Sequence, residues 1–402
     1  MKVHLITNLF QPDELAGAAL YTDLALYLAE RGHDVRVTTT FSYYPAWKVK
    51  PEDRGVRSRD ESFRDIVVRR LWMYVPTTPS GRKRIVSDFS FFWSLVKGAQ
   101  FADWTPDVVL TASPMLSQCL AQRFLYPKGK IPRVIVVQDF VIDAALELKI
   151  LTAPGIKGLL LWLERWSFES AATLITISPA MLEKLQTKLR QSRRTVLLPN
   201  WIHKSLDDAI NSAPNLGQRK ANVLFYSGNL GVKQGLPDVV SSFKRCNTGW
   251  KLKIHGGGAE ADKLRALVNN QSFVEIGNVL EEADYVRELH AATACLITQK
   301  PDIGANFLPS KLLPALASGT PVLAVCDSDT PLGLEVKAGA FGEVVPPGDD
   351  TKLKETLQRW SENPALLEKM SQNALTYGAR YKRTSILSKY ELELERLVLS
   401  KP

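Results

Sequence analysis

Residues 222–236 read NVLFYSGNLGVKQGL, and this stretch decides how the rest of the chain is interpreted. It begins as a short apolar run, passes through three glycines, and is followed by apolar residues at helical spacing, Leu236, Val240 and Phe243. The pattern predicts a strand, a glycine-rich loop and a helix. Glycine lets the backbone approach a bound group closely, and the start of a helix attracts anions. The stretch is therefore a candidate diphosphate site, at which Lys233 adds positive charge.

The glycine motif is short, and an ordinary turn between a strand and a helix explains it equally well. In that interpretation Lys233 is only a surface lysine. The stretch has neither the GxxxxGK[ST] nor the GxGxxG spacing of the two best-known phosphate-binding loops. Features elsewhere in the chain have to distinguish the two interpretations.

The chain has 402 residues, which is long for one hydrophobic core and predicts two domains. Hydrophobic residues make up 45% and charged residues 23%, as in soluble globular proteins. The apolar runs, such as residues 158–163, fall far short of the roughly 20 residues that span a bilayer. Because a strand is predicted directly after Met1, we expect no signal peptide. The four cysteines are far apart and predict buried thiols in a reducing cytoplasm.

The net charge of +9 lies mostly in the first half of the chain. Residues 1–200 contain 27 Lys and Arg against 19 Asp and Glu, and the basic residues are densest between positions 54 and 84. Such a distribution fits nucleic acid, an anionic lipid surface, an anionic substrate or a merely solvated face. No nucleic-acid recognition motif is present, so we expect no nucleic-acid partner. Residues 82–101 combine a basic start with aromatic bulk, which is typical either of an interfacial helix or of a buried helix.

Apolar runs and helical patterns alternate along both halves of the chain. We expect strands near residues 2–7, 35–39, 66–75, 106–111, 132–138 and 173–177, and again near 222–226, 250–255, 273–276, 293–298, 321–325 and 342–345. Because helical segments connect these strands, each half is predicted to be a doubly wound parallel α/β domain. The predicted divisions are a first domain over 1–200, a polar linker over 201–220, a second domain over 221–385, and a C-terminal helix over 386–402 packing near the first domain. Two such domains create a cleft, the default place for a nucleotide-bearing ligand.

Six short motifs follow one another in a fixed order along essentially the whole chain. They occupy residues 14–17, 43–45, 137–140 with Asp143, 198–201, 226–235 and 308–312. This order resembles the retaining GT-B glycosyltransferases of family 4, and in particular the colanic-acid type exopolysaccharide glycosyltransferases of bacteria. Each motif is weak alone, and the signal comes from their order across two halves.

The resemblance implies a GT-B fold, in which two Rossmann-like, doubly wound α/β domains face each other across a cleft. It implies retaining transfer of a hexosyl or deoxyhexosyl group from a UDP- or GDP-linked sugar. The acceptor would be a saccharide or a polyprenyl-diphosphate-linked saccharide of a bacterial surface glycan. We expect a cytoplasmic protein that contacts the inner face of the cytoplasmic membrane peripherally. Because no Asp-x-Asp motif lies in a suitable loop, we expect no metal or other cofactor.

The resemblance also assigns roles to individual residues. Gly17 corresponds to a loop near the donor phosphates, Asp139 to a position where the family often carries a histidine, and Lys233 to a lysine on the diphosphate. Asn229 replaces the family arginine, and we expect Lys311 to supply the missing charge. The predicted catalytic residues are Asp139, Lys233 and Lys311. The predicted donor-binding residues are Gly17, Gly228, Asn229, Lys233, Gln234, Gly256, Gly257, Asn278, Asp302, Gly304, Ala305, Asn306, Ser310 and Lys311.

The chain departs from the family at its pair of glutamates eight residues apart. The alignment places Asn306 and Pro314 at these two positions. Contacts with the donor sugar would then be made by Asp302, by Asn306 or by the backbone amides of Gly304 and Ala305. A non-catalytic nucleotide-binding or partner subunit, and a GT-B sugar-nucleotide epimerase or phosphorylase, are therefore the alternatives to a glycosyltransferase.

Overall fold

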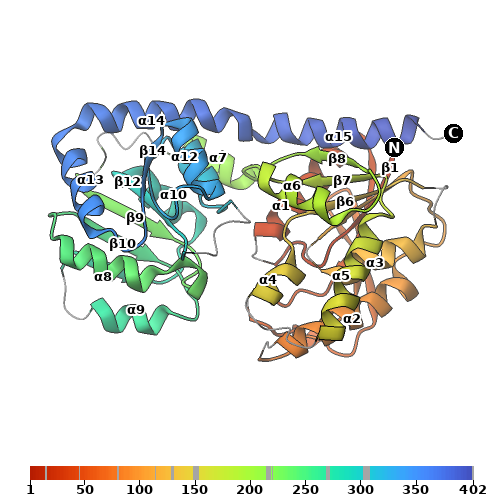
Figure 1. The fold of residues 1–402 in the computed structure, drawn as a ribbon. Helices are drawn as coiled ribbons and strands as arrows, with labels where there is room; N and C mark the ends of the chain where they lie inside the picture. The colour runs from red at the N-terminus through yellow and green to blue at the C-terminus, as the bar shows by residue number, and fades with distance from the viewer. Residues whose placement is uncertain are drawn as a thin grey trace. The chain divides into compact units, whose positions relative to one another are not determined.

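The computed structural model describes residues 1–13, 16–44, 46–78, 81–113, 115–127, 131–147, 154–213, 219, 221–268, 272–301 and 308–400. The chain forms two compact units, one of residues 1–200 with 384–402 and the other of residues 201–383 (Figure 1). None of the helices in these described ranges is long and apolar enough to cross a membrane.

The first unit is built on an eight-stranded sheet of order β3-β4-β2-β1-β5-β6-β7-β8. The strands are β1 (Lys2–Ile6), β2 (Asp34–Thr40), β3 (Ser58–Phe63), β4 (Ile66–Leu71), β5 (Val108–Ala112), β6 (Arg133–Val137), β7 (Thr173–Thr176) and β8 (Arg194–Leu197). All neighbours are parallel except β3 and β4. Strands β5, β6 and β7 are buried throughout, which explains their nearly uninterrupted apolar sequences.

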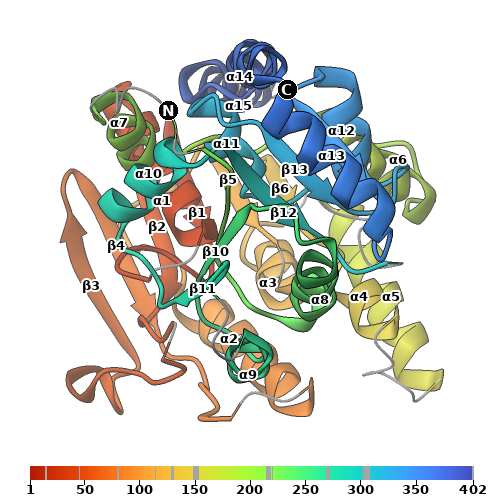
Figure 2. The ribbon, with the colours of Figure 1, turned by 90° about the vertical axis from the view of Figure 1, so that its left-hand side faces the viewer.

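The edge strand β3 is the main element that the sequence pattern does not predict. Its residues alternate between exposed and half-buried, and Figure 2 shows it at the outer edge of the sheet. Charge pairs stabilise it: Arg69 and Arg70 of β4 lie 2.6 Å from Asp60 and Glu61, respectively. Of the nine basic residues between positions 54 and 84, Arg59, Arg69 and Arg70 therefore have carboxylate partners in the described structure.

Helices cover the first sheet. Those in the described part of the unit are α1 (Ala16–Glu30), α2 (Gly81–Gly98), α3 (Leu116–Leu125), α4 (Val141–Glu147), α5 (Pro154–Phe168), α6 (Pro179–Lys188) and α15 (Arg383–Leu399). Neighbouring helices α2, α3 and α5 line one side of the unit (Figure 1). Helix α2 buries Phe91 and Leu95 but leaves Phe89 and Trp93 exposed. The predicted helix over 82–101 is thus a core helix on one face and an exposed aromatic helix on the other.

The C-terminal helix α15 is attached to the first unit by two carboxylates. Glu391 accepts hydrogen bonds from Tyr27, Arg31 and His33 of the α1 region. Glu393 accepts hydrogen bonds from Arg194 and Thr173. Burial opposes ionisation of Glu393, but these hydrogen bonds and that from Arg396 prevail and lower its pKa to about 2.

The second unit has a six-stranded, wholly parallel sheet of order β11-β10-β9-β12-β13-β14. The strands are β9 (Val223–Ser227), β10 (Lys251–His255), β11 (Val274–Gly277), β12 (Ala294–Thr298), β13 (Val322–Val325) and β14 (Gly342–Val345). The helices are α7 (Lys204–Ser212), α8 (Leu236–Cys246), α9 (Ala261–Val268), α10 (Glu282–Ala291), α11 (Leu312–Ala317), α12 (Pro331–Gly339), α13 (Asp350–Glu362) and α14 (Pro364–Gly378). This strand order is that of the doubly wound nucleotide-binding fold.

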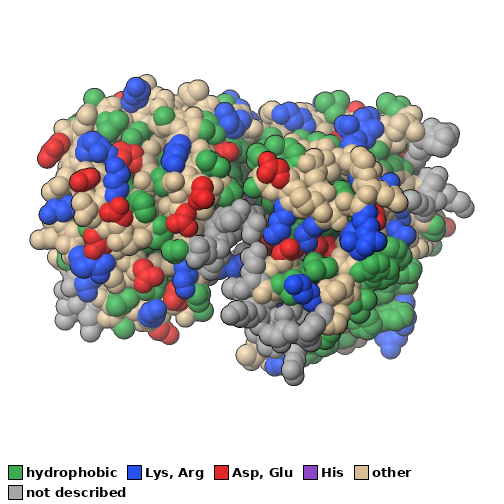
Figure 3. All heavy atoms as spheres, in the orientation of Figure 1, with side chains coloured by type: hydrophobic (Ala, Val, Ile, Leu, Met, Phe, Trp, Pro, Cys, Tyr) green, Lys and Arg blue, Asp and Glu red, His purple; other side chains and the backbone are tan. Residues whose placement is uncertain are grey.

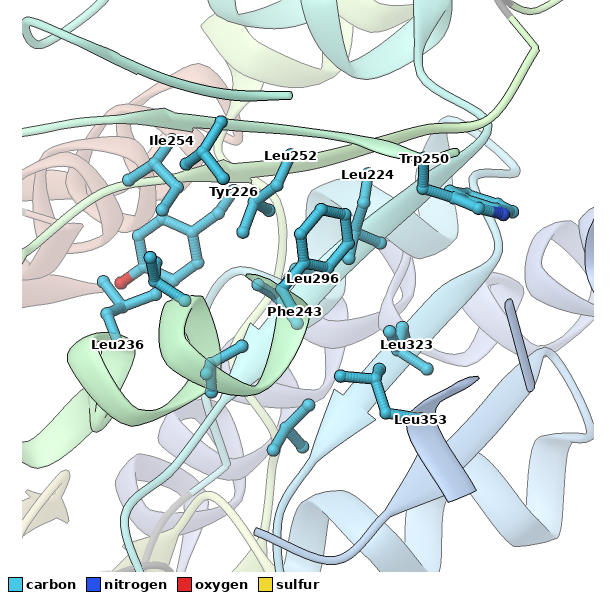
Figure 4. Close-up of a cluster of buried hydrophobic side chains, with 14 of the residues drawn as sticks. Leu224, Tyr226, Leu236, Phe243, Trp250, Leu252, Ile254, Leu296, Leu323 and Leu353 are labelled. Carbon is cyan, nitrogen blue, oxygen red and sulfur yellow. The ribbon is translucent and has the colours of Figure 1, made fainter. Parts of the chain in front are cut away.

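Two hydrophobic clusters cover the two faces of the second sheet. In the cluster under α8, Leu236 and Phe243 pack over Tyr226, Leu252 and Ile254 of the sheet (Figure 4). These helix residues are the periodic apolar positions that follow the glycine loop in the sequence. Core packing therefore sets the position of helix α8. The position of α8 in turn sets where the glycine loop ends.

The predicted linker over 201–220 is not a simple connection. Residues 204–212 form helix α7, which begins at His203 as N-cap and buries Ile210. Helix α7 packs against α10 and α11 and belongs to the second unit, whose last residue is 383. Its two apolar positions, Leu206 and Ile210, lie one turn apart, and the polar residues around them hide this short amphipathic pattern.

Candidate functional site

The strand order of the second unit reverses between β9 and β12, and this is where ligands bind in open α/β sheets. The loop after β9 spans residues 228–235 and contains a 3-10 turn over Val232–Gln234. The loop after β10 begins with three consecutive glycines, residues 256–258. Thr298, at the end of β12, donates a hydrogen bond to the carbonyl of Gln234 at 2.8 Å. The glycine stretch identified in the sequence therefore lies at the switch point of its sheet.

Glycine is required at positions 256 and 258, in the loop after β10, because the backbone of this loop lies directly against that of the loop after β9. Gly228 donates from N–H to the carbonyl of His255 at 2.9 Å, and Leu230 donates to that of Gly257 at 2.9 Å. A Cβ on Gly256, whose φ is +154°, would lie 1.9 Å from the Gly228 carbonyl oxygen. A Cβ on Gly258 would lie 2.6 Å from the Leu230 carbonyl oxygen. Only residues without side chains allow the two loops to approach in this way.

Lys311 lies across the first of these loops. It is the N-cap of α11, and a Cβ on Gly228 would lie 2.6 Å from its Cε and 2.8 Å from its Nζ. The Nζ atom is 4.9 Å from the centre of the Tyr226 ring. Burial lowers the pKa of Lys311, and a weaker opposing effect comes from Cys295. Within the described ranges no hydrogen bond or ion pair reaches this Nζ, so an anion bound beside Gly228 would supply the missing counter-charge.

The other predicted residues of the loop after β9 occupy different environments. Asn229 is exposed, and its carbonyl accepts a 2.6 Å hydrogen bond from the Tyr226 hydroxyl. Lys233 is half-buried in the 3-10 turn, and its carbonyl accepts from the N–H of Lys300. The Oε1 atom of Gln234 is buried without a hydrogen-bond partner in the described part of the chain. That oxygen is available to a donor group on a ligand.

Asn278 lies at the end of β11, next to the second loop. It is exposed, and its carbonyl accepts a 3.2 Å hydrogen bond from Nδ1 of His255. The His255 ring covers Gly277, where a Cβ would lie 2.3 Å from the ring. Val279 is 75% exposed, and its Cγ2 would lie 3.6 Å from a Cβ on Gly257. The ends of β10 and β11 are therefore in contact with each other beside the glycines.

The remaining predicted residues lie outside the described ranges, directly before Lys311, or in the first unit. Asp302, Gly304, Ala305 and Asn306 lie outside the described residues. Ser310 is exposed immediately before Lys311. Gly17 and Asp139 belong to the first unit, Gly17 in the first turn of α1 and Asp139 exposed after β6.

Pro314 is buried in the first turn of α11. Proline is tolerated in a first turn because N–H groups there have no partner within the helix.

Sequence reasoning missed three residues that shape the loop pair, Tyr226, His255 and Gly258. Tyr226 supports both Asn229 and Lys311, and His255 connects to both Gly228 and Asn278. The glycine run at 256–258 was a signal for Gly258. For the tyrosine and the histidine there was no local signal, because their role arises from contacts between strands far apart in the sequence.

Comparison with known proteins covers both units. Residues 16–201 match the glycosyl transferase 4-like domain family, and residues 208–376 match the glycosyl transferases group 1 family. The chain is 30% identical over 358 residues to WcaI of Escherichia coli (strain K12), whose name assigns it to colanic acid biosynthesis as a glycosyl transferase. That alignment covers 83% of this chain and 85% of WcaI.

Two solved structures show the same fold. The sucrose-phosphate synthase of Thermosynechococcus elongatus superposes with a TM-score of 0.77 at 18% identity, over 100% of both chains. Anabaena Alr3699/HepE, solved with UDP-glucose, superposes with a TM-score of 0.66 at 14% identity, over 98% of this chain and 100% of that chain. The predicted GT-B fold, with two Rossmann-like α/β units, is confirmed. The chain therefore belongs to the glycosyltransferases that join a glycosyl transferase 4-like domain to a group 1 domain.

Proposed function

We propose that the chain transfers a sugar from a nucleotide-diphosphate donor to a saccharide or lipid-linked saccharide of a bacterial surface glycan, with retention at the anomeric carbon. The observation that carries the proposal is Lys311, a half-buried lysine held over Gly228 without a counter-charge among the described residues. A diphosphate at the switch point would provide that counter-charge. The complexes of Anabaena Alr3699/HepE with UDP and UDP-glucose support the choice of donor class.

In the proposed reaction the bond between the anomeric carbon and the diphosphate oxygen breaks, and negative charge develops on the phosphate. Lys311 and Lys233 stabilise that charge, together with N–H groups of the loop after β9. The acceptor hydroxyl attacks the same face of the sugar and forms the new bond. Its proton passes to the leaving diphosphate, so no enzyme nucleophile is needed. Asp139, in the first unit, is proposed to contact the donor sugar.

The acceptor belongs to the same proposal. WcaI is named for colanic acid biosynthesis, and a lipopolysaccharide glycosyltransferase, WaaG, superposes with a TM-score of 0.65. The names of these relatives support a saccharide acceptor, and we extend the proposal to a polyprenyl-diphosphate-linked saccharide. A lipid-linked acceptor would bring the protein to the inner face of the cytoplasmic membrane, and we propose peripheral contact there.

Turnover of a panel of UDP- and GDP-sugars tests the proposal, with donor hydrolysis measured in the absence of acceptor. The preferred donor should be hydrolysed by the wild type, and Lys311→Met and Lys233→Ala should each lower the rate by about 10²–10³. Lys369→Met is the control, because Lys369 is exposed on α14 and should leave the rate unchanged. Wild-type rates in both loop variants would refute the assignment of the site.

The same assay addresses metal independence and the alternatives. We expect EDTA to leave the rate within about twofold, and a loss of activity restored by Mg²⁺ or Mn²⁺ would contradict this. A protein that binds a UDP- or GDP-sugar in the panel but turns over none of them would be the non-catalytic subunit instead. Conversion of the donor sugar into its epimer would identify the epimerase.

A further inference from the structure

A strip of aromatic side chains runs across three helices of the first unit. We call it the aromatic face, and it consists of Phe89, Phe92 and Trp93 of α2, Phe124 of α3, and Trp162 and Trp166 of α5. The ring centres of Phe92 and Phe124 lie 5.7 Å apart, those of Phe124 and Trp166 5.9 Å, and those of Trp166 and Trp162 5.8 Å. Segments distant in sequence therefore form one continuous surface.

Four of the six side chains of the aromatic face are exposed, and Phe92 and Trp166 are half-buried. Phe89 is 61% exposed, Phe124 54%, Trp93 48% and Trp162 46%. Ile85, Val86, Ile156 and Leu159 extend it and are also exposed. Figure 3 shows hydrophobic side chains gathered over this side of the unit. A contiguous apolar surface of this kind marks an interaction site.

Charge indicates what the aromatic face contacts. The three helices contain seven basic residues and only two acidic ones, Asp88 and Glu164. Both carboxylates turn inward: Asp88 accepts from the N–H of Ser117 at 3.0 Å, and Glu164 accepts from Nζ of Lys188 at 2.6 Å. The exposed basic residues of these helices are Lys83, Arg84, Lys97 and Lys157. In the described part of the helices, the exposed charge beside the aromatic face is therefore entirely positive.

We propose that the aromatic face inserts into the headgroup region of an anionic lipid bilayer. Tryptophan and phenylalanine suit this region, and lysine and arginine beside them pair with lipid phosphates. The Arg123 guanidinium lies 3.9 Å from the Trp166 ring centre, and the Lys97 Nζ lies 5.8 Å from the Trp93 ring centre. Basic groups and aromatic rings are therefore in contact, so both can reach the headgroup region together.

A second copy of the chain is a poorer occupant of this face. The exposed residues Lys83, Arg84, Lys97 and Lys157 form a positive rim of the aromatic face. Symmetric pairing would bring the positive rims of two copies together, and like charges across an interface oppose association. An anionic bilayer instead complements both the apolar strip and its rim. The inference deepens the membrane contact proposed above by naming its surface, and it is independent of the donor chemistry.

Co-sedimentation of the full chain with lipid vesicles tests the aromatic part. Wild type should bind vesicles of phosphatidylglycerol and phosphatidylethanolamine and bind pure phosphatidylcholine weakly. The variant Phe89→Ser/Trp93→Ser/Trp162→Ser should bind the anionic vesicles at least about tenfold more weakly, because each side chain loses its buried apolar area. The matched control is Leu334→Ser/Leu392→Ser, which removes two equally exposed apolar side chains elsewhere and should bind as wild type does.

The charged rim is tested separately. Lys83→Gln/Lys97→Gln/Lys157→Gln should weaken binding to anionic vesicles by roughly tenfold to hundredfold at low salt and reduce its salt dependence. Lys354→Gln/Lys369→Gln/Lys389→Gln removes the same charge from exposed lysines on other helices and should have little effect. Thermal unfolding of every variant checks that the fold is retained.

Absence of wild-type binding to anionic vesicles at low salt would overturn the proposal, as would unchanged binding of the aromatic variant. A stable wild-type dimer that ignores vesicles and dissociates in the aromatic variant would assign the face to a second copy instead. Donor hydrolysis measured in solution distinguishes failure of the membrane proposal from failure of the proposed glycosyltransferase function. The aromatic variant should hydrolyse the donor like wild type, and vesicle binding by a chain that hydrolyses no donor would leave the surface proposal standing.

Discussion

The loop after the first strand of each unit is shaped in a different way. After β9, in the second unit, Gly228 has a φ of +133° and the backbone is in contact with the loop after β10. After β1, in the first unit, side chains hold the loop: Asp13 accepts hydrogen bonds from the N–H groups of Tyr43 and Tyr44. A Cβ on Gly17 would have no described atom within 4 Å, and φ at this glycine is not positive. The fold therefore constrains Gly256 and Gly258 of the second unit, whereas no described atom and no positive φ requires a glycine at position 17.

The largest effect expected from this comparison is at Gly256. Gly256→Ala should lower the free energy of unfolding by about 3–5 kcal/mol, because the new Cβ would collide with the Gly228 carbonyl and the φ of +154° disfavours a side chain. Urea unfolding measures the change. Gly257→Ala is the matched control: its nearest neighbour is Val279 at 3.6 Å, and its stability should change by less than about 0.5 kcal/mol. Equal losses in both variants would show that backbone interlocking does not shape the loops.

A smaller effect, on activity alone, is expected at Gly17. Gly17→Ala should retain or slightly gain stability, since alanine favours a helix by up to about 1 kcal/mol and nothing described obstructs the methyl group. Sugar transfer should nevertheless fall at least about tenfold if a ligand approaches this backbone. Thermal unfolding measures the stability of this variant, and the sugar-transfer rate of the same preparation measures its activity. A fully active variant would remove Gly17 from the site.

A further effect appears only at acid pH and concerns a fully buried histidine of the first unit. His4 in β1 contacts the Tyr126 hydroxyl at 2.7 Å and the Thr38 hydroxyl at 2.8 Å, and burial, with Arg69 and Arg36 nearby, lowers its pKa to about 3. The unfolded chain takes up this proton near pH 6.5, but the folded unit does so only near pH 3. Stability of the first unit should therefore fall as pH drops from 6.5 toward 3.

The variant His4→Asn checks this pH dependence. Its urea midpoint should change less than that of wild type between about pH 6.5 and about pH 4, because the buried imidazole no longer contributes. Equal slopes for the two proteins would contradict the assignment. Above about pH 6.5 the slopes should agree.

The sequence predicted what depends on local pattern. Strands β6 and β12 fall within predicted segments, and β5 extends one residue beyond its segment, because buried parallel strands are largely apolar. The polar strand β3 was missed because ion pairs with β4, rather than an apolar face, stabilise it. At the site, Gly228, Gly256 and Lys311 were named from motifs, and the structure brings them together. Tyr226 and His255 were not named, because their importance depends on tertiary contacts that no local pattern reports.

The central claim is that the two glycine loops of the second unit, with Lys311 above them, bind the donor diphosphate. Hydrogen–deuterium exchange of the full chain with and without saturating UDP or GDP tests it most directly. The nucleotide that binds should slow exchange in peptides covering residues 228–235 and 256–258, and Lys311→Met should abolish that protection at the same concentration. Saturating nucleotide binding without protection of either loop, or with equal protection in the variant, would contradict the account.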